Sequence, residues 1–115
     1  MKVLIKNPII LFSKKIRLVK TLKKREYEEE YPEKFKWAIQ MLYSEEDKWI
    51  EICRIDNFMH KGDCQSHIHL FRKRKVWKVN LTFHEAEKEI FIIGKKILRE
   101  YFNEEVNFDE EKNYN

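Results

Sequence analysis

The chain has 115 residues, of which 43% are hydrophobic and 38% are charged, with a formal net charge of +4. This length fits one domain, the hydrophobic content excludes a disordered chain, and no run of about 18 apolar residues is present that could span a membrane. The apolar start is interrupted at Lys6, Asn7 and Pro8 and is a poor secretory signal, so we expect a cytoplasmic protein.

Charge is arranged in blocks along the chain. Residues 1–25 carry nine Lys or Arg and no acid, and residues 58–78 carry six against one Asp, whereas residues 26–57 and 79–115 are acidic on balance. Basic blocks that flank an acid-base cluster suit a polyanion such as RNA. The alternative is that lysines on edge strands only prevent edge-to-edge pairing.

Alternation of apolar and polar residues predicts strands over most of the first 81 residues. Segment 3–12, interrupted at Asn7-Pro8, is predicted to form an edge strand or two short strands, and segment 16–22 is predicted to form an amphipathic strand. Two hairpins follow, one from segments 34–43 and 48–55 and one from segments 66–71 and 76–81. The alternation in residues 34–43 is the most regular, with Phe, Trp, Ile, Met and Tyr on one face.

A C-terminal helix is predicted after these strands. Thr82 and Glu85 have the spacing of a capping box, and apolar residues then recur at helical spacing as far as Tyr101. The sequence therefore predicts an α+β domain over residues 1–105, an antiparallel sheet of five or six strands with one C-terminal amphipathic helix packed on one face. Residues 106–115 are expected to be a frayed polar tail.

One apolar side chain does not fit the buried arc of this helix. Ile92 falls on its polar side. It is either part of a homodimer contact, together with Phe91, or an incidental exposed apolar residue.

The chemistry of the chain is concentrated in residues 54–69, which read RIDNFMHKGDCQSHIH. In a strand that starts at Ser66, His67 and His69 share one face, with Cα atoms about 7 Å apart. Ile68 and Leu70 then face the core, which would leave both imidazoles open to solvent or ligand. Histidine titrates near neutrality, so one ring could accept a proton while the other donates one. The alternative is a pair of solvated strand residues.

Other residues of this segment could complete such a site. Asp56 could orient a histidine or cap a turn, and Lys61 could contact a phosphate or only form a tight turn. Arg54 could clamp a phosphate or pair with a glutamate across the sheet. We take His67, His69, Asp56 and Lys61 as candidate catalytic residues. Candidate phosphate-binding or nucleic-acid-binding residues are Arg54, Asn57, Asp63, Arg72, Lys73, Arg74 and Lys75.

A zinc site is the metal alternative in this segment. His60, Asp63, Cys64, His67 and His69 could supply ligands, but their spacing matches none of the usual structural zinc patterns. No metal and no cofactor are therefore expected. The two cysteines do not make a disulfide scaffold and are expected to be reduced thiols.

The order of these features resembles a known family. A lysine-rich strand, the hairpin KFKWAIQMLY…WIEICRIDN, a DN-x-x-x-KGD turn, an HxH pair, a strand and an amphipathic helix are similar to the TumE-like family, regarded as the toxin partners in prokaryotic toxin-antitoxin loci. The matching positions are Arg54, Asp56, Asn57, Lys61, Gly62, Asp63, His67 and His69. The chain departs from the pattern where Ile55 replaces an aromatic residue, where His60 replaces a glycine, and where residues 64–66 separate Asp63 from the HxH pair.

The resemblance implies a toxin role and a DNA-binding antitoxin as a partner. We expect a toxin-like protein that acts on RNA, with metal-independent endoribonuclease chemistry by His67 and His69 as the reaction that these residues would support. Arg54 and Lys61 would stabilise charge on the phosphate, and Asp56 would orient a histidine. The alternative is a non-catalytic module that binds nucleic acid or a protein through the basic hairpin at residues 72–75.

Overall fold

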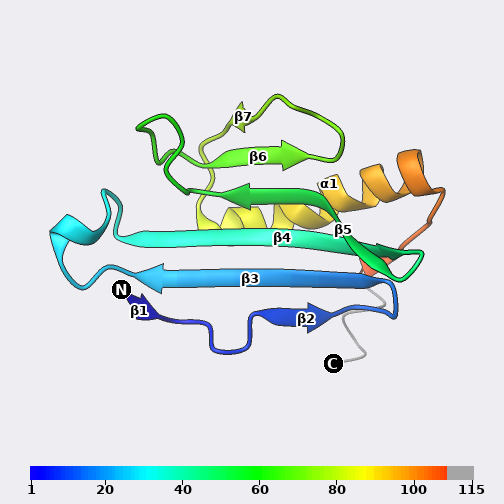
Figure 1. The fold of residues 1–115 in the computed structure, drawn as a ribbon, viewed down its shortest axis with the longest axis horizontal. Coiled ribbons are helices and arrows are strands. Elements are labelled where there is room, and N and C mark those ends of the chain that lie inside the picture. Colours follow the sequence, from blue (N-terminus) through cyan, green and yellow to red (C-terminus); the bar gives the residue numbers. More distant parts are fainter. Residues whose placement is uncertain (109–115) are drawn as a thin grey trace.

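Seven strands form one antiparallel sheet in the computed structural model, which describes residues 1–108, and one long helix lies across one face of the sheet (Figure 1). The order across the sheet is β1-β3-β4-β5-β6-β7, and β2 pairs with β3 on the same side as β1. The elements are β1 (Lys2–Val3), β2 (Ile9–Leu11), β3 (Ile16–Lys24), the short helix η1 (Glu28–Glu30), β4 (Phe35–Glu45), β5 (Lys48–Asp56), β6 (His67–Leu70), β7 (Trp77–Lys78) and α1 (Phe83–Phe102). The predicted α+β fold is confirmed.

The core lies between the sheet and α1. Alternate residues of β4 turn their apolar side chains toward the helix, and these residues are buried: Trp37, Ile39, Met41 and Tyr43. The helix contributes the buried residues Ala86, Ile90, Gly94, Ile97 and Leu98. Each large side chain in this layer stabilises the fold by about 1.5–3 kcal/mol.

Helix α1 begins where the capping box was predicted. The Thr82 hydroxyl accepts from the backbone N–H of Glu85 at 3.2 Å, and the Glu85 carboxylate accepts from the backbone N–H of Thr82 at 2.9 Å. At its other end Asn103 adopts a left-handed conformation, and its N–H donates to the carbonyl of Leu98. Ile92 is exposed on the outer side of the helix, as the pattern predicted.

The packed part of the chain continues past the helix. Val106 and Phe108 are buried, and the Phe108 ring lies 5.0 Å from that of Phe91 and 5.9 Å from that of Phe12. The domain therefore extends at least to Phe108, beyond the predicted boundary at residue 105, because these two apolar side chains cover the end of the core. The rest of the expected tail, residues 109–115, lies outside the described residues. Within residues 1–108 no helix is both long enough and apolar enough to cross a membrane.

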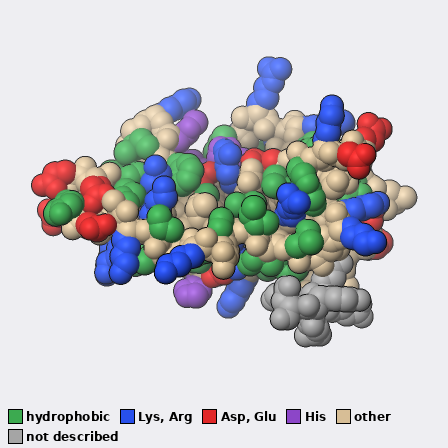
Figure 2. Space-filling model, turned by 60° about the horizontal axis from the view of Figure 1, so that its bottom comes forward, with side chains coloured by type: hydrophobic (Ala, Val, Ile, Leu, Met, Phe, Trp, Pro, Cys, Tyr) green, Lys and Arg blue, Asp and Glu red, His purple; other side chains and the backbone are tan. Residues whose placement is uncertain are grey.

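The sheet order separates the two basic blocks. The first block belongs to the edge formed by β1, β2 and β3, whereas β6 lies beyond β4 and β5. With about 4.8 Å between neighbouring strands, β3 and β6 are roughly 14 Å apart. Only the second block therefore adjoins the histidine segment. Figure 2 shows Lys and Arg side chains spread over the visible face, with acidic side chains mainly at the two ends, one of which carries η1.

Candidate active site

Four of the predicted site residues share the face of the sheet that α1 leaves open. The register of β5 and β6 sets Arg54 opposite His69 and Asp56 opposite His67. Directly opposed residues in an antiparallel pair project to the same face. The helix covers the other face, where Gly94 approaches Met41.

The Asp56 carboxylate is the centre of this cluster. Its Oδ2 atom lies 3.0 Å from Nε of Arg54 and 3.3 Å from Nε2 of His69, and its Oδ1 atom accepts from the backbone N–H of Phe58 at 2.9 Å. Its side chain is only 4% exposed. One oxygen of Asp56 therefore caps the turn after β5, and the other faces a histidine.

His69 is the accessible histidine of the cluster, with 25% of its side chain exposed. Partial burial and the nearby Arg54 guanidinium lower its pKa, and although the Asp56 and Glu51 carboxylates oppose this shift, the pKa lies below the ordinary value. The neutral form of His69, which can accept a proton, is therefore favoured. With the ring proton on Nε2, facing Asp56, the Nδ1 atom is the one that can accept a proton.

His67 is not open to solvent, in contrast to the prediction. The residue is 2% exposed, and the ring of His60 packs edge-on against it at a centroid distance of 5.3 Å. Neither ring nitrogen of His67 has a hydrogen-bond partner among residues 1–108. The strand period correctly placed His67 on the open face, but the 57–66 loop folds over that face and covers it.

Lys61 lies at the tip of this loop and is not among the groups that contact Asp56. Its φ of 51° and the φ of 80° at Gly62 form a tight turn closed by paired backbone hydrogen bonds between His60 and Asp63. The structure therefore favours the turn-forming role of Lys61 over a catalytic one. Its side chain is exposed to solvent.

Asp63 forms an ion pair that the sequence did not reveal. Its Oδ2 atom lies 2.5 Å from Nζ of Lys78, and its Oδ1 atom accepts from the backbone N–H of Gln65 at 2.8 Å. Both contacts, that with Lys78 first, hold the pKa of Asp63 below its usual range. Lys78 is the strand partner of His67, so its side chain rises from the same face. In the sequence, only the predicted hairpin of segments 66–71 and 76–81 could have indicated that Lys78 lies beside His67.

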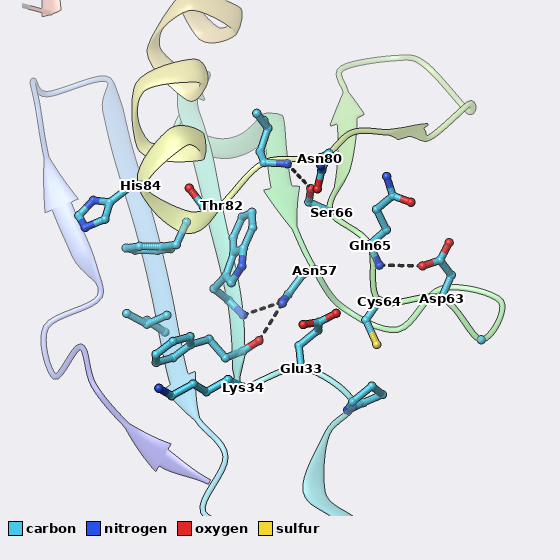
Figure 3. A pocket seen from close by; sticks show the side chains of 17 residues that line it. Glu33, Lys34, Asn57, Asp63, Cys64, Gln65, Ser66, Asn80, Thr82 and His84 are labelled. Atoms are coloured by element: carbon cyan, nitrogen blue, oxygen red, sulfur yellow. Dashed lines mark hydrogen bonds between the residues drawn. The ribbon is translucent and has the colours of Figure 1, made fainter. Parts of the chain in front are cut away.

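Asn57 has a structural role rather than the predicted role in phosphate binding. The residue is buried, its Oδ1 atom accepts from the backbone N–H of Trp37 at 2.8 Å, and its Nδ2 atom donates to the carbonyl of Phe35 at 2.8 Å (Figure 3). The hydroxyl of Tyr31 donates to the Asn57 carbonyl. The side-chain amide therefore ties the end of β5 to the backbone of β4.

The groove of about 690 Å³ drawn in Figure 3 is separate from this cluster. It lies between the start of α1, residues 32–35 and residues 62–66, and Asp63, Cys64 and Asn57 contribute to its wall. His67, His69 and Asp56 do not line it. The groove and the histidine cluster are thus two different features of the molecule.

The basic turn between β6 and β7 carries the other predicted nucleic-acid contacts. Arg72, Lys73, Arg74 and Lys75 are all exposed. The Arg72 guanidinium lies 5.1 Å from the Phe71 ring centre, and Lys75 Nζ lies 5.7 Å from that of Trp77. This turn directly follows β6, the strand that holds His67 and His69.

Neither cysteine is bonded to the other. Both are free and buried, and burial raises the pKa of the Cys53 thiol. In the described part of the chain no three His, Cys, Asp or Glu side chains are placed to hold a metal ion.

Comparisons with protein-family models, with curated proteins and with solved structures find no match to this chain.

Proposed function

We propose that this protein acts on RNA as a toxin-like endoribonuclease of the TumE-like kind. The observation that carries the proposal is the Asp56 carboxylate, which lies between His69 and Arg54 on the sheet face that α1 does not cover. The pattern of residues 54–69, which resembles that family, supports the same conclusion. A DNA-binding antitoxin is the corresponding protein partner.

The proposed reaction is an internal transesterification of RNA. Nδ1 of His69 accepts the proton of a ribose 2′-hydroxyl, the 2′-oxygen attacks the adjacent phosphorus, and the bond to the 5′-oxygen breaks. His67 donates a proton to the departing 5′-oxygen, which requires that the 57–66 loop first move off its ring. The products are a 2′,3′-cyclic phosphate and a free 5′-hydroxyl, so protons and charge balance.

The remaining groups of the cluster assist this reaction. Asp56 orients His69 and stabilises the imidazolium that forms when His69 takes a proton. Arg54 has Nη1 at 3.4 Å from Glu51 and Nε at 3.0 Å from Asp56, which fixes the guanidinium beside the histidines. A fixed cation in this position stabilises the charge that develops on the phosphorane oxygens.

Histidine variants test the proposal. His69→Ala and His67→Ala should each lower the rate of cleavage of a synthetic RNA by about 100-fold or more and relieve growth inhibition on expression. His84→Ala is the matched control, because His84 is 93% exposed at the start of α1 and lies outside the cluster. Cleavage by the His69→Ala variant at the wild-type rate would exclude His69 as the base and with it the proposed mechanism.

A non-catalytic RNA-binding module is the second candidate, and the exposed basic turn at residues 72–75 favours it. Such a module would bind RNA in a salt-sensitive manner that survives loss of both histidines. Binding measured on the double variant His67→Ala/His69→Ala, in parallel with cleavage, separates the two candidates. Neutral substitutions at all four basic positions of the turn should abolish binding only if the turn is the contact surface.

A further inference from the structure

Three side-chain contacts hold the middle of the 57–66 loop over the open face, and hydrogen bonds of Asn57 and Ser66 anchor its two ends. The Phe58 ring lies 4.8 Å from Nζ of Lys36, and the His60 ring packs on His67. The third contact is the ion pair between the loop and β7 described above, which joins two full charges of opposite sign.

Closure of the loop buries two polar atoms that have no hydrogen-bond partner in the described part of the chain. Both nitrogens of the His67 ring are buried without a hydrogen-bond partner among residues 1–108. Buried polar groups are nearly always satisfied in folded proteins, so this arrangement disfavours the closed loop. Opening would give both nitrogens access to water or to a ligand.

Lys78 stands beside this histidine, and its charge is neutralised by the loop. The Asp63 carboxylate contacts Nζ at 2.5 Å, while the lysine side chain remains 60% exposed. Arg54, near the other end of the cluster, already faces the two carboxylates of Asp56 and Glu51. Lys78 is therefore the cation next to His67 whose carboxylate partner belongs to a loop that could move away.

We propose that Lys78 is a phosphate-binding residue of this site and that, in the absence of RNA, the Asp63 carboxylate occupies the position of the phosphate. The identity of the anion rests on the proposed function. A phosphodiester carries one negative charge and offers oxygen acceptors, as the Asp63 carboxylate does, so it can take over the contact with Nζ. The loop then loses its ion pair and uncovers His67, which makes the second histidine available only when substrate is bound.

Oligonucleotide binding tests the exchange. The probe is a fluorescein-labelled ten-nucleotide RNA with 2′-O-methyl groups, which cannot be cleaved because it lacks the attacking 2′-hydroxyl. By fluorescence anisotropy Asp63→Asn should bind it about two- to five-fold more tightly than wild type, the range expected for removal of a partly exposed ion pair. Lys78→Met should bind it about five-fold more weakly, because a phosphate contact is lost.

Two controls isolate the effect of net charge. Asp47→Asn and Lys48→Met alter the charge in the same way at exposed positions, the first in the β4–β5 turn and the second at the start of β5, away from the loop. The amide oxygen introduced by Asp63→Asn can still accept from the backbone of Gln65, so the local turn is preserved. Equal binding by Asp63→Asn and Asp47→Asn, or tighter binding by Lys78→Met than by wild type, would overturn the proposal.

Chemical modification of His67 reports on the loop without RNA. Diethyl pyrocarbonate should modify His67 about two- to five-fold faster in both Asp63→Asn and Lys78→Met than in wild type. Mass-spectrometric fragmentation locates the modified ring, and the exposed His84 is the internal reference. Unchanged His67 modification in both variants would show that the ion pair does not hold the loop. If the binding and modification results are as expected but the wild-type protein does not cleave RNA, the nuclease proposal is refuted and the exchange between Asp63 and phosphate stands.

Discussion

Replacement of Asp56 should destabilise the protein in two distinguishable steps. In Asp56→Asn the amide oxygen can still accept from the backbone N–H of Phe58, but the amide nitrogen takes the position that faces Arg54 and His69. Asp56→Ala removes the Phe58 acceptor as well. The two variants therefore separate the ionic contacts of this carboxylate from its turn-capping bond.

The magnitudes follow from burial and contact type. A hydrogen bond to a charged group contributes about 1.5–3 kcal/mol, and the 35% exposure of Arg54 places the loss near the lower end of this range. Together with the cost of a buried amide that faces other donors, we expect Asp56→Asn to lower the free energy of unfolding by about 2 kcal/mol. Loss of the bond from Phe58 adds about 1 kcal/mol in Asp56→Ala.

Urea unfolding monitored by tryptophan fluorescence measures both values. Asp47→Asn is the matched control, and because its side chain is exposed on a turn we expect a change within about 0.5 kcal/mol. If both Asp56 variants were within 0.5 kcal/mol of wild type, or if Asp56→Asn cost more than Asp56→Ala, the central role assigned to this carboxylate would be refuted.

Two other predictions concern the pH response and the core. Because the pKa of His69 lies below the unfolded value of about 6.5, stability from this residue is fully present above that value and is lost as the pH falls through the folded value. The urea midpoint of His69→Gln should consequently fall less than that of wild type between pH 8 and pH 5; an equal fall contradicts the assignment. Gly94→Ala places a Cβ atom 2.3 Å from Sδ of the buried Met41, so overpacking should outweigh the gain in helix propensity and cost about 1 kcal/mol in urea unfolding. The shorter side chain in Met41→Val should relieve this clash, and strictly additive effects in the double variant would contradict it.

The sequence indicated the parts of the fold that depend on neighbours along the chain. The capping box joins residues three apart, Thr82 and Glu85, and the alternation in β4 joins residues two apart. Both patterns are set by the geometry of one helix or one strand, and both were confirmed. The exposed position of Ile92 follows from the same helical period.

The candidate site was predictable only in part. The strand period placed His67 and His69 on one face, and the structure brings Arg54 and Asp56 to that face through the β5–β6 register. The burial of His67 was missed because it depends on how the loop folds back over the sheet. Asn57 was grouped with the phosphate-binding or nucleic-acid-binding candidates of segment 54–69, whereas its amide pairs with the backbone of a strand about twenty residues earlier in the chain.

The sequence by itself determined the α+β class, the helix start, the main hairpin and the face on which the histidines lie, because these follow from local periods and capping. Only the tertiary structure decided which side chains meet. The Asp63–Lys78 ion pair and the Asp56–His69 contact cross between separate elements, and the three-dimensional path of the loop determines both the cover over His67 and the neighbours of each charge. Strand register and loop closure result from packing across the whole sheet, and a pattern within one segment does not contain them.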